Sequence, residues 1–243
     1  MQNTVRCVDK IHAIFILNGL FTDHLTKEIS DSMTIKVAIN GFGRIGRLAL
    51  RAAWHRDDYE IVHINEVAGD AHAAAHLLKY DSVHGTWDRS ITSEGSGSEA
   101  RIVIDGQSIA YSQNQHIADT DWSGVGMVVE CTGTFKSQEA LAPYFDQSVK
   151  KVVVSAPVKD GTLNVVMGVN DHLYTNQAIV TAASCTTNCL APVVDVLQKT
   201  FGIKHAAITT IHDITNTQSV LDEYHSDLRR SRASGLSLIP TST

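Results

Sequence analysis

Short apolar runs alternate along the chain with segments whose apolar residues recur every three or four positions. Runs rich in β-branched residues predict buried strands, and the three-to-four spacing predicts helices that pack on them. Strands are expected at 34–39, 59–65, 125–133, 150–157, 163–170 and 178–184, and helices at 41–56, 70–80, 137–148 and 189–202. Alternation of this kind builds right-handed β-α-β units, so we predict an α/β fold with a doubly wound, mostly parallel sheet.

Other local signals complete this outline. Asp70 is expected to cap the helix that follows it. Residues 99–112 predict a hairpin that turns at Asp105 and Gly106. Residues 206–218 form a β-rich run, which predicts a further strand, and the serine- and glycine-rich stretch 93–100 predicts a loop.

Composition limits the classes of function. The chain has 243 residues, of which 43% are hydrophobic and 19% charged, as in ordinary soluble globular proteins. A net charge of −6 argues against a nucleic-acid or anionic-membrane surface. The twelve histidines and four cysteines show neither metal-ligand spacing nor a disulfide framework. We therefore expect no metal, and reduced thiols in a cytoplasmic protein.

The first 33 residues differ from the rest of the chain. Their apolar stretch, residues 11–21, is too short to cross a bilayer. Arg6 and Lys10 precede it, as in a signal peptide, but no small-residue cleavage site follows. Met33 lies directly before the first predicted strand. We expect residues 1–33 to be an extension of doubtful order, or the product of an upstream start.

A glycine-rich loop joins the first predicted strand to the first predicted helix. Gly41, Gly43 and Gly46 have G-x-G-x-x-G spacing, which in this context is typical of a dinucleotide-binding turn. Gly41 allows the tight turn, Gly43 lets a pyrophosphate approach the backbone, and Gly46 lets helix and strand pack closely. Glu66 follows the second strand, where a carboxylate accepts hydrogen bonds from ribose hydroxyls and repels a 2′-phosphate. A Rossmann-type site for NAD rather than NADP is predicted; the alternative is an ordinary glycine-rich turn with a surface glutamate.

Cys185 falls where a predicted strand meets a predicted helix. A thiol there lies in the field of the helix N-terminus, beside N–H donors that stabilise a thiolate. Ser184 and Thr186 add hydroxyl donors for an anion. Cys189, one turn further on, and Cys131, at a strand end, are expected to pack as small apolar groups.

A nucleophilic cysteine needs a base or a cation beside it. His212 is the candidate, although a histidine in a strand is usually structural. Asp213, the next residue, should point to the opposite face of the strand and is not assigned to a triad. Thr215 and the pair Arg229–Arg230 could hold a phosphate, with a solvated charge run as the alternative.

Five segments together resemble phosphorylating glyceraldehyde-3-phosphate dehydrogenase: INGFGRIGR, LLKYDSVHG, ASCTTNCLAP, TTIH and DLRRSRA…SLIPTST. The resemblance runs from about Thr34 to Thr243. It implies an NAD-binding Rossmann domain at 34–184 and the start of an α+β catalytic domain at 185–243, in an enzyme that acts as a homotetramer. Family members continue well beyond Thr243, so we expect an incomplete catalytic domain that is weakly active or inactive and prone to aggregate.

The resemblance also implies a mechanism. Cys185 would attack the aldehyde of glyceraldehyde 3-phosphate, hydride would pass to NAD, and phosphate would release an acyl phosphate from the thioester. His212 would activate the thiol and act as the acid–base group. Further implied positions are Asn40, Arg44, Ile45 and Thr132 beside the dinucleotide, Ser184, Thr186 and Thr243 at the inorganic phosphate, and Thr215 with Arg230 at the substrate phosphate.

One departure concerns the co-substrate. Ile214 stands where the glycolytic pattern has an aromatic residue before Thr-Asn. With the segments HINEVAGD and AHAAAHLLKYDSVHG, this resembles the branch associated with arsenic-resistance operons, in which arsenate replaces phosphate and the product is 1-arseno-3-phosphoglycerate instead of 1,3-bisphosphoglycerate. Arsenate is a near-isostere of phosphate, so the anion pocket alone does not separate them. Erythrose-4-phosphate dehydrogenase, a non-catalytic NAD-binding fragment and a redox-sensing thiol protein stay as alternatives.

Overall fold

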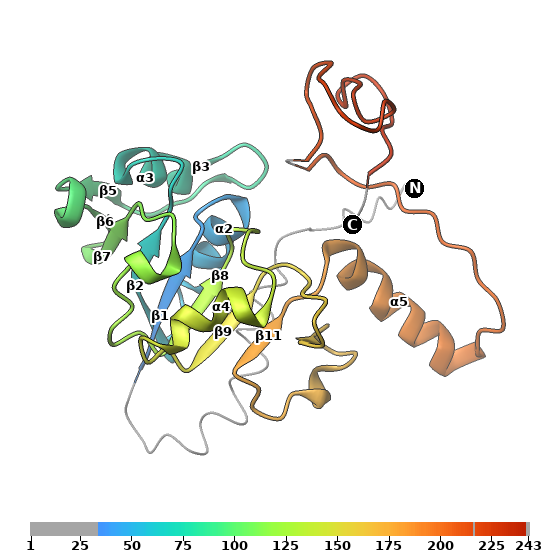
Figure 1. Ribbon diagram of the computed structural model, residues 1–243, viewed down its shortest axis with the longest axis horizontal. Helices are drawn as coiled ribbons and strands as arrows, with labels where there is room; N and C mark the ends of the chain where they lie inside the picture. Colours follow the sequence, from blue (N-terminus) through green and yellow to red (C-terminus); the bar gives the residue numbers. More distant parts are fainter. Residues whose placement is uncertain (1–33, 216, 242–243) are drawn as a thin grey trace. The chain divides into compact units, whose positions relative to one another are not determined.

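A computed structural model describes residues 34–215 and 217–241 (Figure 1). These residues form two compact units, one ending at Pro192 and the other beginning at Val193. The predicted extension 1–33 and the predicted phosphate residue Thr243 lie outside the described residues. Within the described ranges, no helix combines the length and apolar character needed to cross a membrane.

A nine-stranded sheet forms the centre of the first unit, in the order β10-β11-β9-β8-β1-β2-β7-β6-β5. All neighbouring pairs from β10 to β7 are parallel, and β6 and β5 continue the sheet in antiparallel fashion. The strands are β1 Ile35–Asn40, β2 Tyr59–Asn65, β5 Ile91–Glu94, β6 Arg101–Ile104, β7 Gln107–Ser112, β8 Met127–Glu130, β9 Lys151–Val154, β10 Leu163–Asn164 and β11 Ile179–Thr181. A separate ribbon pairs β3 Tyr80–Asp81 with β4 Gly85–Thr86.

Both faces of this sheet are buried. Ile39 of β1 and Val129 of β8 belong to one buried cluster, whereas their neighbours Ala38 and Val128 belong to another. Side chains of α2 and α3 join the first cluster, and those of α4 join the second. The helices are α2 Arg44–Ala53, α3 Ala71–Lys79, α4 Gln138–Phe145 and α5 Cys185–Phe201, with 3-10 turns η1 Gly97–Glu99, η2 Ile117–Asp119 and η3 Asp171–Leu173. The predicted doubly wound α/β fold is confirmed.

Several local predictions hold in detail. Asp70 caps α3, because its Oδ1 accepts a hydrogen bond from Ala73 N at 2.8 Å. The hairpin between β6 and β7 turns at Asp105 and Gly106, with φ of 50° and 89°. Two positive φ angles in a two-residue loop match the twist of the flanking strands.

The predicted strand at 163–170 is mostly wrong. Only Leu163–Asn164 pairs with the sheet, as β10. The chain then folds back, since Asn170 Oδ1 accepts from Val166 N at 2.7 Å and its Nδ2 donates to Asn164 O at 2.9 Å. An asparagine side chain that bonds nearby backbone in this way competes with extension of the strand.

The second unit has no strand among its described residues. The backbone hydrogen bonds described within it close turns and loops, for example Glu223 N to Ser231 O at 2.9 Å and Ser234 N to Ser219 O at 3.0 Å, and do not pair strands. The prediction of a strand at 206–218 is therefore wrong for the residues that the structure describes. A β-rich run becomes a strand only beside another strand, and the described part of this unit supplies none.

Candidate active site

The glycine loop lies at the point where the chain order of the parallel sheet reverses. From β1 the chain proceeds to β2 and on to the edge strand β5, comes back through β6 to β7, and then crosses to β8 on the other side of β1. The carboxyl ends of two such central strands form the usual ligand crevice of an open α/β sheet. Gly41 follows β1 with φ of 87°, and a Cβ placed on it would lie 2.5 Å from Thr132 N, just after β8. Only glycine fits this turn.

The other two glycines differ in what surrounds them. A Cβ on Gly46 would lie 2.2 Å from Gly41 O, so close packing of α2 on the loop requires glycine there. A Cβ on Gly43 would meet no atom within 4 Å. Gly43 therefore faces open space, into which a ligand can approach the backbone.

The N-terminus of α2 has no side-chain cap. Asp70, Ser137 and Ser184 each supply a side-chain oxygen that accepts a backbone N–H in the first turn of α3, α4 and α5. In α2 the capping position is Gly43, and no acid occupies the first turn. Arg44 opens the helix, and its buried Nε finds no hydrogen-bond partner among the described residues. An uncapped helix N-terminus beside an arginine fits a pyrophosphate.

Glu66 contacts the glycine loop directly. Its Oε2 accepts from Phe42 N at 2.6 Å, and its Oε1 accepts from Ala68 N at 2.8 Å. Arg47 Nη1 donates to Phe42 O at 2.9 Å, so the backbone N–H and C=O of Phe42 are both hydrogen-bonded. The carboxylate is oriented at the end of β2 and partly exposed, the position from which it can accept from a ribose hydroxyl and repel a 2′-phosphate.

The remaining predicted dinucleotide residues flank this loop. Ile45 lies in the first turn of α2 and is partly exposed. Asn40 ends β1 and is only 2% exposed, so its amide faces the protein interior. Thr132 follows β8 and is partly exposed. The first unit thus brings all eight predicted dinucleotide positions to one edge of the sheet.

Cys185 is the first residue of α5, so its predicted place between strand and helix is correct. Ser184 Oγ accepts from Thr187 N at 3.1 Å and lies 2.8 Å from Thr187 Oγ1. Ser184 therefore caps α5, and it is also the residue directly before Cys185. Cys185 and Thr186 are both partly exposed.

Two residues that hold this turn were not found by sequence reasoning. Ala183 is buried and has φ of 55°, a left-handed conformation uncommon for residues other than glycine. Asn188, also buried, donates from Nδ2 to Ala182 O at 2.6 Å and to Ser184 O at 2.9 Å. Asparagine is a poor helix former, and its presence one turn inside a helix was the available signal.

The other two cysteines that the structure describes in the first unit, Cys131 and Cys189, differ in their burial. Burial raises the pKa of the Cys131 thiol to about 12, so this thiol stays protonated near neutral pH. Cys189 is exposed, which is contrary to the expectation that it packs as a buried apolar group. Neither is in a disulfide. Among the described residues, no group of three or more histidine, cysteine or acidic side chains is placed to hold a metal ion.

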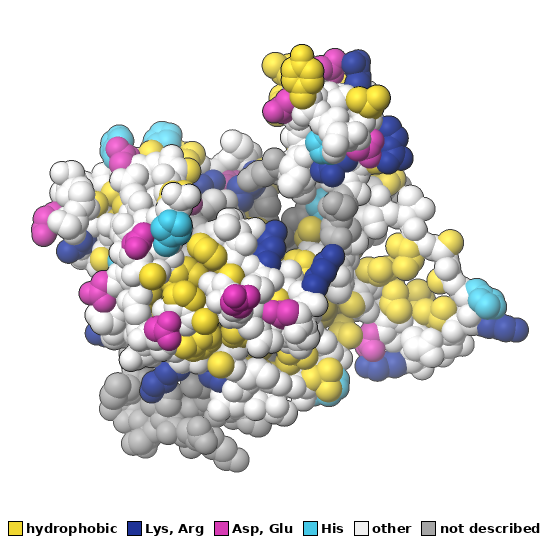
Figure 2. Space-filling model, in the orientation of Figure 1, with side chains coloured by type: hydrophobic (Ala, Val, Ile, Leu, Met, Phe, Trp, Pro, Cys, Tyr) yellow, Lys and Arg dark blue, Asp and Glu magenta, His cyan; other side chains and the backbone are white. Residues whose placement is uncertain are grey.

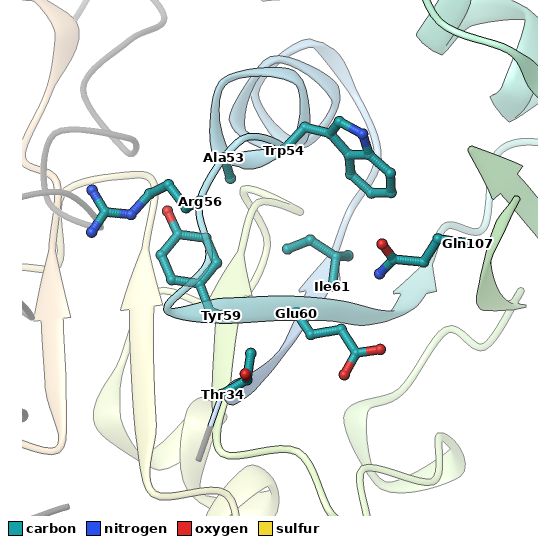
Figure 3. A pocket seen from close by; sticks show the side chains of 8 residues that line it. All are labelled: Thr34, Ala53, Trp54, Arg56, Tyr59, Glu60, Ile61 and Gln107. Carbon is teal, nitrogen blue, oxygen red and sulfur yellow. The ribbon is translucent and has the colours of Figure 1, made fainter. Parts of the chain in front are cut away.

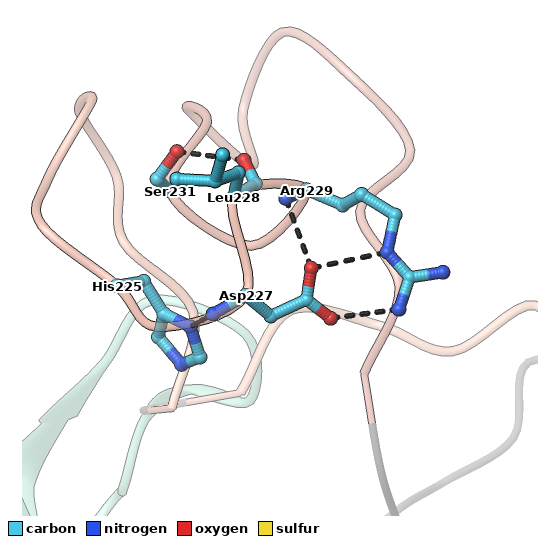
Figure 4. Close-up of polar contacts among 5 residues, drawn as sticks. All are labelled: His225, Asp227, Leu228, Arg229 and Ser231. Carbon is cyan, nitrogen blue, oxygen red and sulfur yellow. Dashed lines mark hydrogen bonds and ion pairs between the residues drawn. The ribbon is translucent and has the colours of Figure 1, made fainter.

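Within the second unit, the two neighbouring arginines differ in their hydrogen bonds. Arg229 is paired with Asp227 through Nε–Oδ1 at 3.0 Å and Nη2–Oδ2 at 2.7 Å (Figure 4), and these bonds lower the pKa of Asp227 to about 2. Arg230 donates weakly to Thr217 O at 3.4 Å, and its buried Nε finds no hydrogen-bond partner in the described part of the chain. Arg230 is therefore better suited than Arg229 to receive an anion.

His212 and Thr215 also lie in the second unit. The Nδ1 atom of His212 is 2.7 Å from Asp213 O. Thr215 Oγ1 lies 3.1 Å from Thr217 Oγ1, so Thr215 and Arg230 both contact Thr217. The expectation that Asp213 points to the opposite face of a strand no longer applies, because no strand is present there.

A hollow of about 250 Å³ lies elsewhere in the first unit (Figure 3). Its lining includes Trp54, Arg56, Tyr59, Glu60 and Gln107. Tyr59 and Glu60 begin β2, so the hollow is at the amino end of that strand, whereas the glycine loop is at the carboxyl end. Ligands of open α/β sheets bind at the carboxyl ends, and this hollow is not the dinucleotide site.

Comparisons with known proteins identify relatives of this chain. Residues 35–138 match the model described as "Glyceraldehyde 3-phosphate dehydrogenase, NAD binding domain", and residues 184–243 match the corresponding "C-terminal domain". The chain is 56% identical over 215 residues to glyceraldehyde-3-phosphate dehydrogenase 3 of Nostoc sp., an alignment covering 87% of this chain and 63% of the relative. It is 46% identical to the enzyme of that name from Priestia megaterium and 45% identical to that from Geobacillus stearothermophilus, with the same coverage. The chain therefore spans 63% of the length of these relatives.

Proposed function

The chain belongs to the glyceraldehyde-3-phosphate dehydrogenase family, and we propose that its activity is the NAD-dependent oxidation of glyceraldehyde 3-phosphate with inorganic phosphate. The observation that carries the proposal is the placement of Cys185 at the first residue of α5, on a turn held by Ser184 and Asn188. A thiol at a helix N-terminus is the arrangement that favours a nucleophilic thiolate.

NAD is the cofactor, and the residues of the glycine loop fit it. The uncapped N-terminus of α2 and Arg44 would hold the pyrophosphate, and Gly43 would leave room for it beside the backbone. Glu66 would accept hydrogen bonds from the ribose hydroxyls, and Thr132 would contribute to holding the dinucleotide. When bound, the nicotinamide accepts the hydride that leaves the substrate.

The chain's own residues supply the covalent chemistry. The Cys185 thiolate adds to the aldehyde carbon, and His212 protonates the resulting oxygen, giving a thiohemiacetal. His212 then removes the same proton as hydride departs, which leaves a thioester on Cys185. Inorganic phosphate attacks the thioester carbonyl, releasing 1,3-bisphosphoglycerate and restoring the thiolate.

Two anion sites accompany this chemistry. Ser184 and Thr186, with Thr243, are proposed to bind the inorganic phosphate beside Cys185. Thr215 and Arg230 are proposed to bind the phosphate of the substrate. The shared contact of Thr215 and Arg230 with Thr217, and the buried Nε of Arg230, support this second site.

The organisation of the protein follows from the same family. We propose an NAD-binding domain at 34–184, a catalytic domain that begins at 185, assembly as a homotetramer, and a cytoplasmic role in glycolysis. Arsenate in place of phosphate, in arsenic resistance, is the second candidate, and the observation that favours it is Ile214 where the glycolytic pattern has an aromatic residue. A non-catalytic NAD-binding role is favoured by the exposure of the second unit, in which no described residue is buried.

The test is NADH formation by the purified chain from glyceraldehyde 3-phosphate, with phosphate or arsenate, and with erythrose 4-phosphate as the alternative aldehyde. We expect slow NADH formation that Cys185→Ser abolishes and that Cys189→Ser, the matched thiol control one turn away, leaves intact. NAD binding without turnover in the unmodified chain would favour the non-catalytic role. Turnover that survives Cys185→Ser would reject the assigned nucleophile.

A further inference from the structure

A buried carboxylate lies beneath the glycine loop. Glu130 ends β8 and is 1% exposed. Its Oε1 accepts from Thr132 N at 2.8 Å and from Thr132 Oγ1 at 2.5 Å, and its Oε2 accepts from Tyr144 OH at 2.7 Å and Asn40 Nδ2 at 3.0 Å. Four donors thus converge on the two oxygens, the largest number that a carboxylate ordinarily accepts.

Two of these partners border the loop from opposite sides. Asn40 directly precedes Gly41, and the backbone of Thr132 approaches Gly41 so closely that a Cβ could not be added. Cys131 N also donates to Asn40 O at 2.6 Å. The carboxylate of Glu130 therefore joins the ends of β1 and β8 at the point where the ligand crevice opens.

The orientation of Asn40 is set from its other side as well. Its Oδ1 accepts from Asn65 Nδ2 at 2.8 Å, and Asn65 Oδ1 accepts from Ser112 Oγ at 2.8 Å and Asn114 N at 2.9 Å. The hydrogen bonds form a continuous line across β8, β1, β2 and β7, just below the carboxyl edge of the sheet. Such a fully satisfied buried network holds its members in one arrangement.

Burying the Glu130 carboxylate at the end of β8 lowers the free energy of unfolding, because the charge is removed from water. Burial raises the pKa of Glu130, although the hydrogen bonds from Thr132, Tyr144 and Asn40 act in the opposite direction. An apolar side chain would avoid the cost of desolvation at the end of a buried strand. What an apolar side chain would not do is orient Thr132 and Asn40 relative to the loop.

We infer that Glu130 is a positioning residue of the dinucleotide site: its carboxylate holds Thr132 and Asn40 so that the backbone at Gly41 and Thr132 presents a fixed surface to the dinucleotide. The inference rests on the proposed NAD binding and deepens it. Glu130 does not touch the dinucleotide itself, because it is buried and its four acceptor positions are filled.

The test is the dissociation constant for NAD, measured by titration calorimetry on the whole chain. Glu130→Gln keeps the size of the side chain but turns an amide donor toward the donors of Thr132 or Asn40. We expect the dissociation constant to rise about tenfold, as for loss of a hydrogen bond to a charged group. Val153→Ala is the matched control, since it removes buried methyl groups from β9 on the sheet face opposite Tyr144. The Val153→Ala protein should be less stable, while its dissociation constant for NAD should stay at the wild-type value.

Tyr144→Phe is the second variant, which keeps the test decisive where Glu130→Gln does not fold. It removes one donor from Oε2 and should raise the dissociation constant by a smaller factor. A wild-type dissociation constant in the folded Glu130→Gln protein, or in Tyr144→Phe where only that variant folds, would overturn the inference alone. If Val153→Ala raised the dissociation constant for NAD by the same factor, the inference would also be overturned, since the loss of affinity would then result from the loss of stability. Absence of NAD binding by the unmodified chain would overturn the proposed function and this inference with it.

Discussion

Both units of the chain contain large apolar residues, but among the described residues only the first unit buries them. In the first unit, successive residues of β1 and β8 are buried in alternate clusters on the two faces of the sheet. In the second unit, none of the described residues is buried. Its large apolar side chains are open to solvent, for example Phe201 at 81% exposed and Leu228 at 79%. Figure 2 shows hydrophobic side chains gathered at the surface over α5.

This difference shows that a segment can form a helix without burying its apolar face. In α5, Val193, Val196, Leu197 and Phe201 have the spacing of one helix face, yet all four are exposed. The helix forms from its own sequence, but an apolar face is buried only when another element packs on it. The sheet of the first unit supplies such elements for its helices, whereas the described residues of the second unit supply none. Four predictions test this contrast, in order of decreasing effect.

The largest expected effect comes from matched leucines in the two units. Leu50 is fully buried in α2, so Leu50→Ala should lower the free energy of unfolding by about 2–5 kcal/mol. Leu228→Ala, at an exposed position, should change it by less than about 0.5 kcal/mol. Urea denaturation followed by circular dichroism measures both. Equal losses would mean that the second unit has a core of its own.

A second pair separates packing from ligand binding in the glycine loop. Gly41→Ala should lower the free energy of unfolding by about 2 kcal/mol, because the new Cβ meets the backbone of Thr132 at a positive φ. In Gly43→Ala the new Cβ meets no atom within 4 Å, so the free energy of unfolding should stay nearly unchanged. The same Cβ should weaken NAD binding several-fold, because it fills the space through which the pyrophosphate approaches the backbone. Denaturation and NAD titration of both variants check this. Unchanged NAD affinity in Gly43→Ala would show that the dinucleotide does not approach there.

The third prediction concerns the turn before Cys185. Asn188→Ala leaves Ala182 O and Ser184 O without their donor, so stability should fall by about 1–2 kcal/mol. The rate of Cys185 alkylation by iodoacetamide should change too, since the left-handed Ala183 turn loses its support. Mass spectrometry of the alkylated peptide, in a Cys189→Ser background, gives that rate. An unaltered rate would limit Asn188 to a purely structural role.

The smallest expected effect on stability is at the exposed face of α5. Phe201→Lys should change the free energy of unfolding by less than about 0.5 kcal/mol, because the ring is already in water. It should nevertheless reduce self-association, since it removes the most exposed apolar side chain of that face. Light scattering against concentration measures association, with Gln198→Lys as the charge-matched control on the same helix. Equal reduction by both would assign the effect to net charge.

The sequence alone predicted what depends on near neighbours. The Asp70 cap, the Asp105–Gly106 hairpin and the start of a helix beside Cys185 were all predicted correctly, because each is encoded within a few residues. The spacing of the three glycines between a strand and a helix likewise predicted the loop. The fold class followed from the alternation of such local elements.

Tertiary structure decided what depends on residues far apart in the chain. The approach of Gly41 to Thr132, and the convergence of Asn40, Tyr144 and Thr132 on Glu130, arise only when β1 and β8 become neighbours. The same reason accounts for the missing strand at 206–218. A strand and a buried carboxylate network need hydrogen-bond partners from distant segments, and local spacing carries no information about whether those partners arrive.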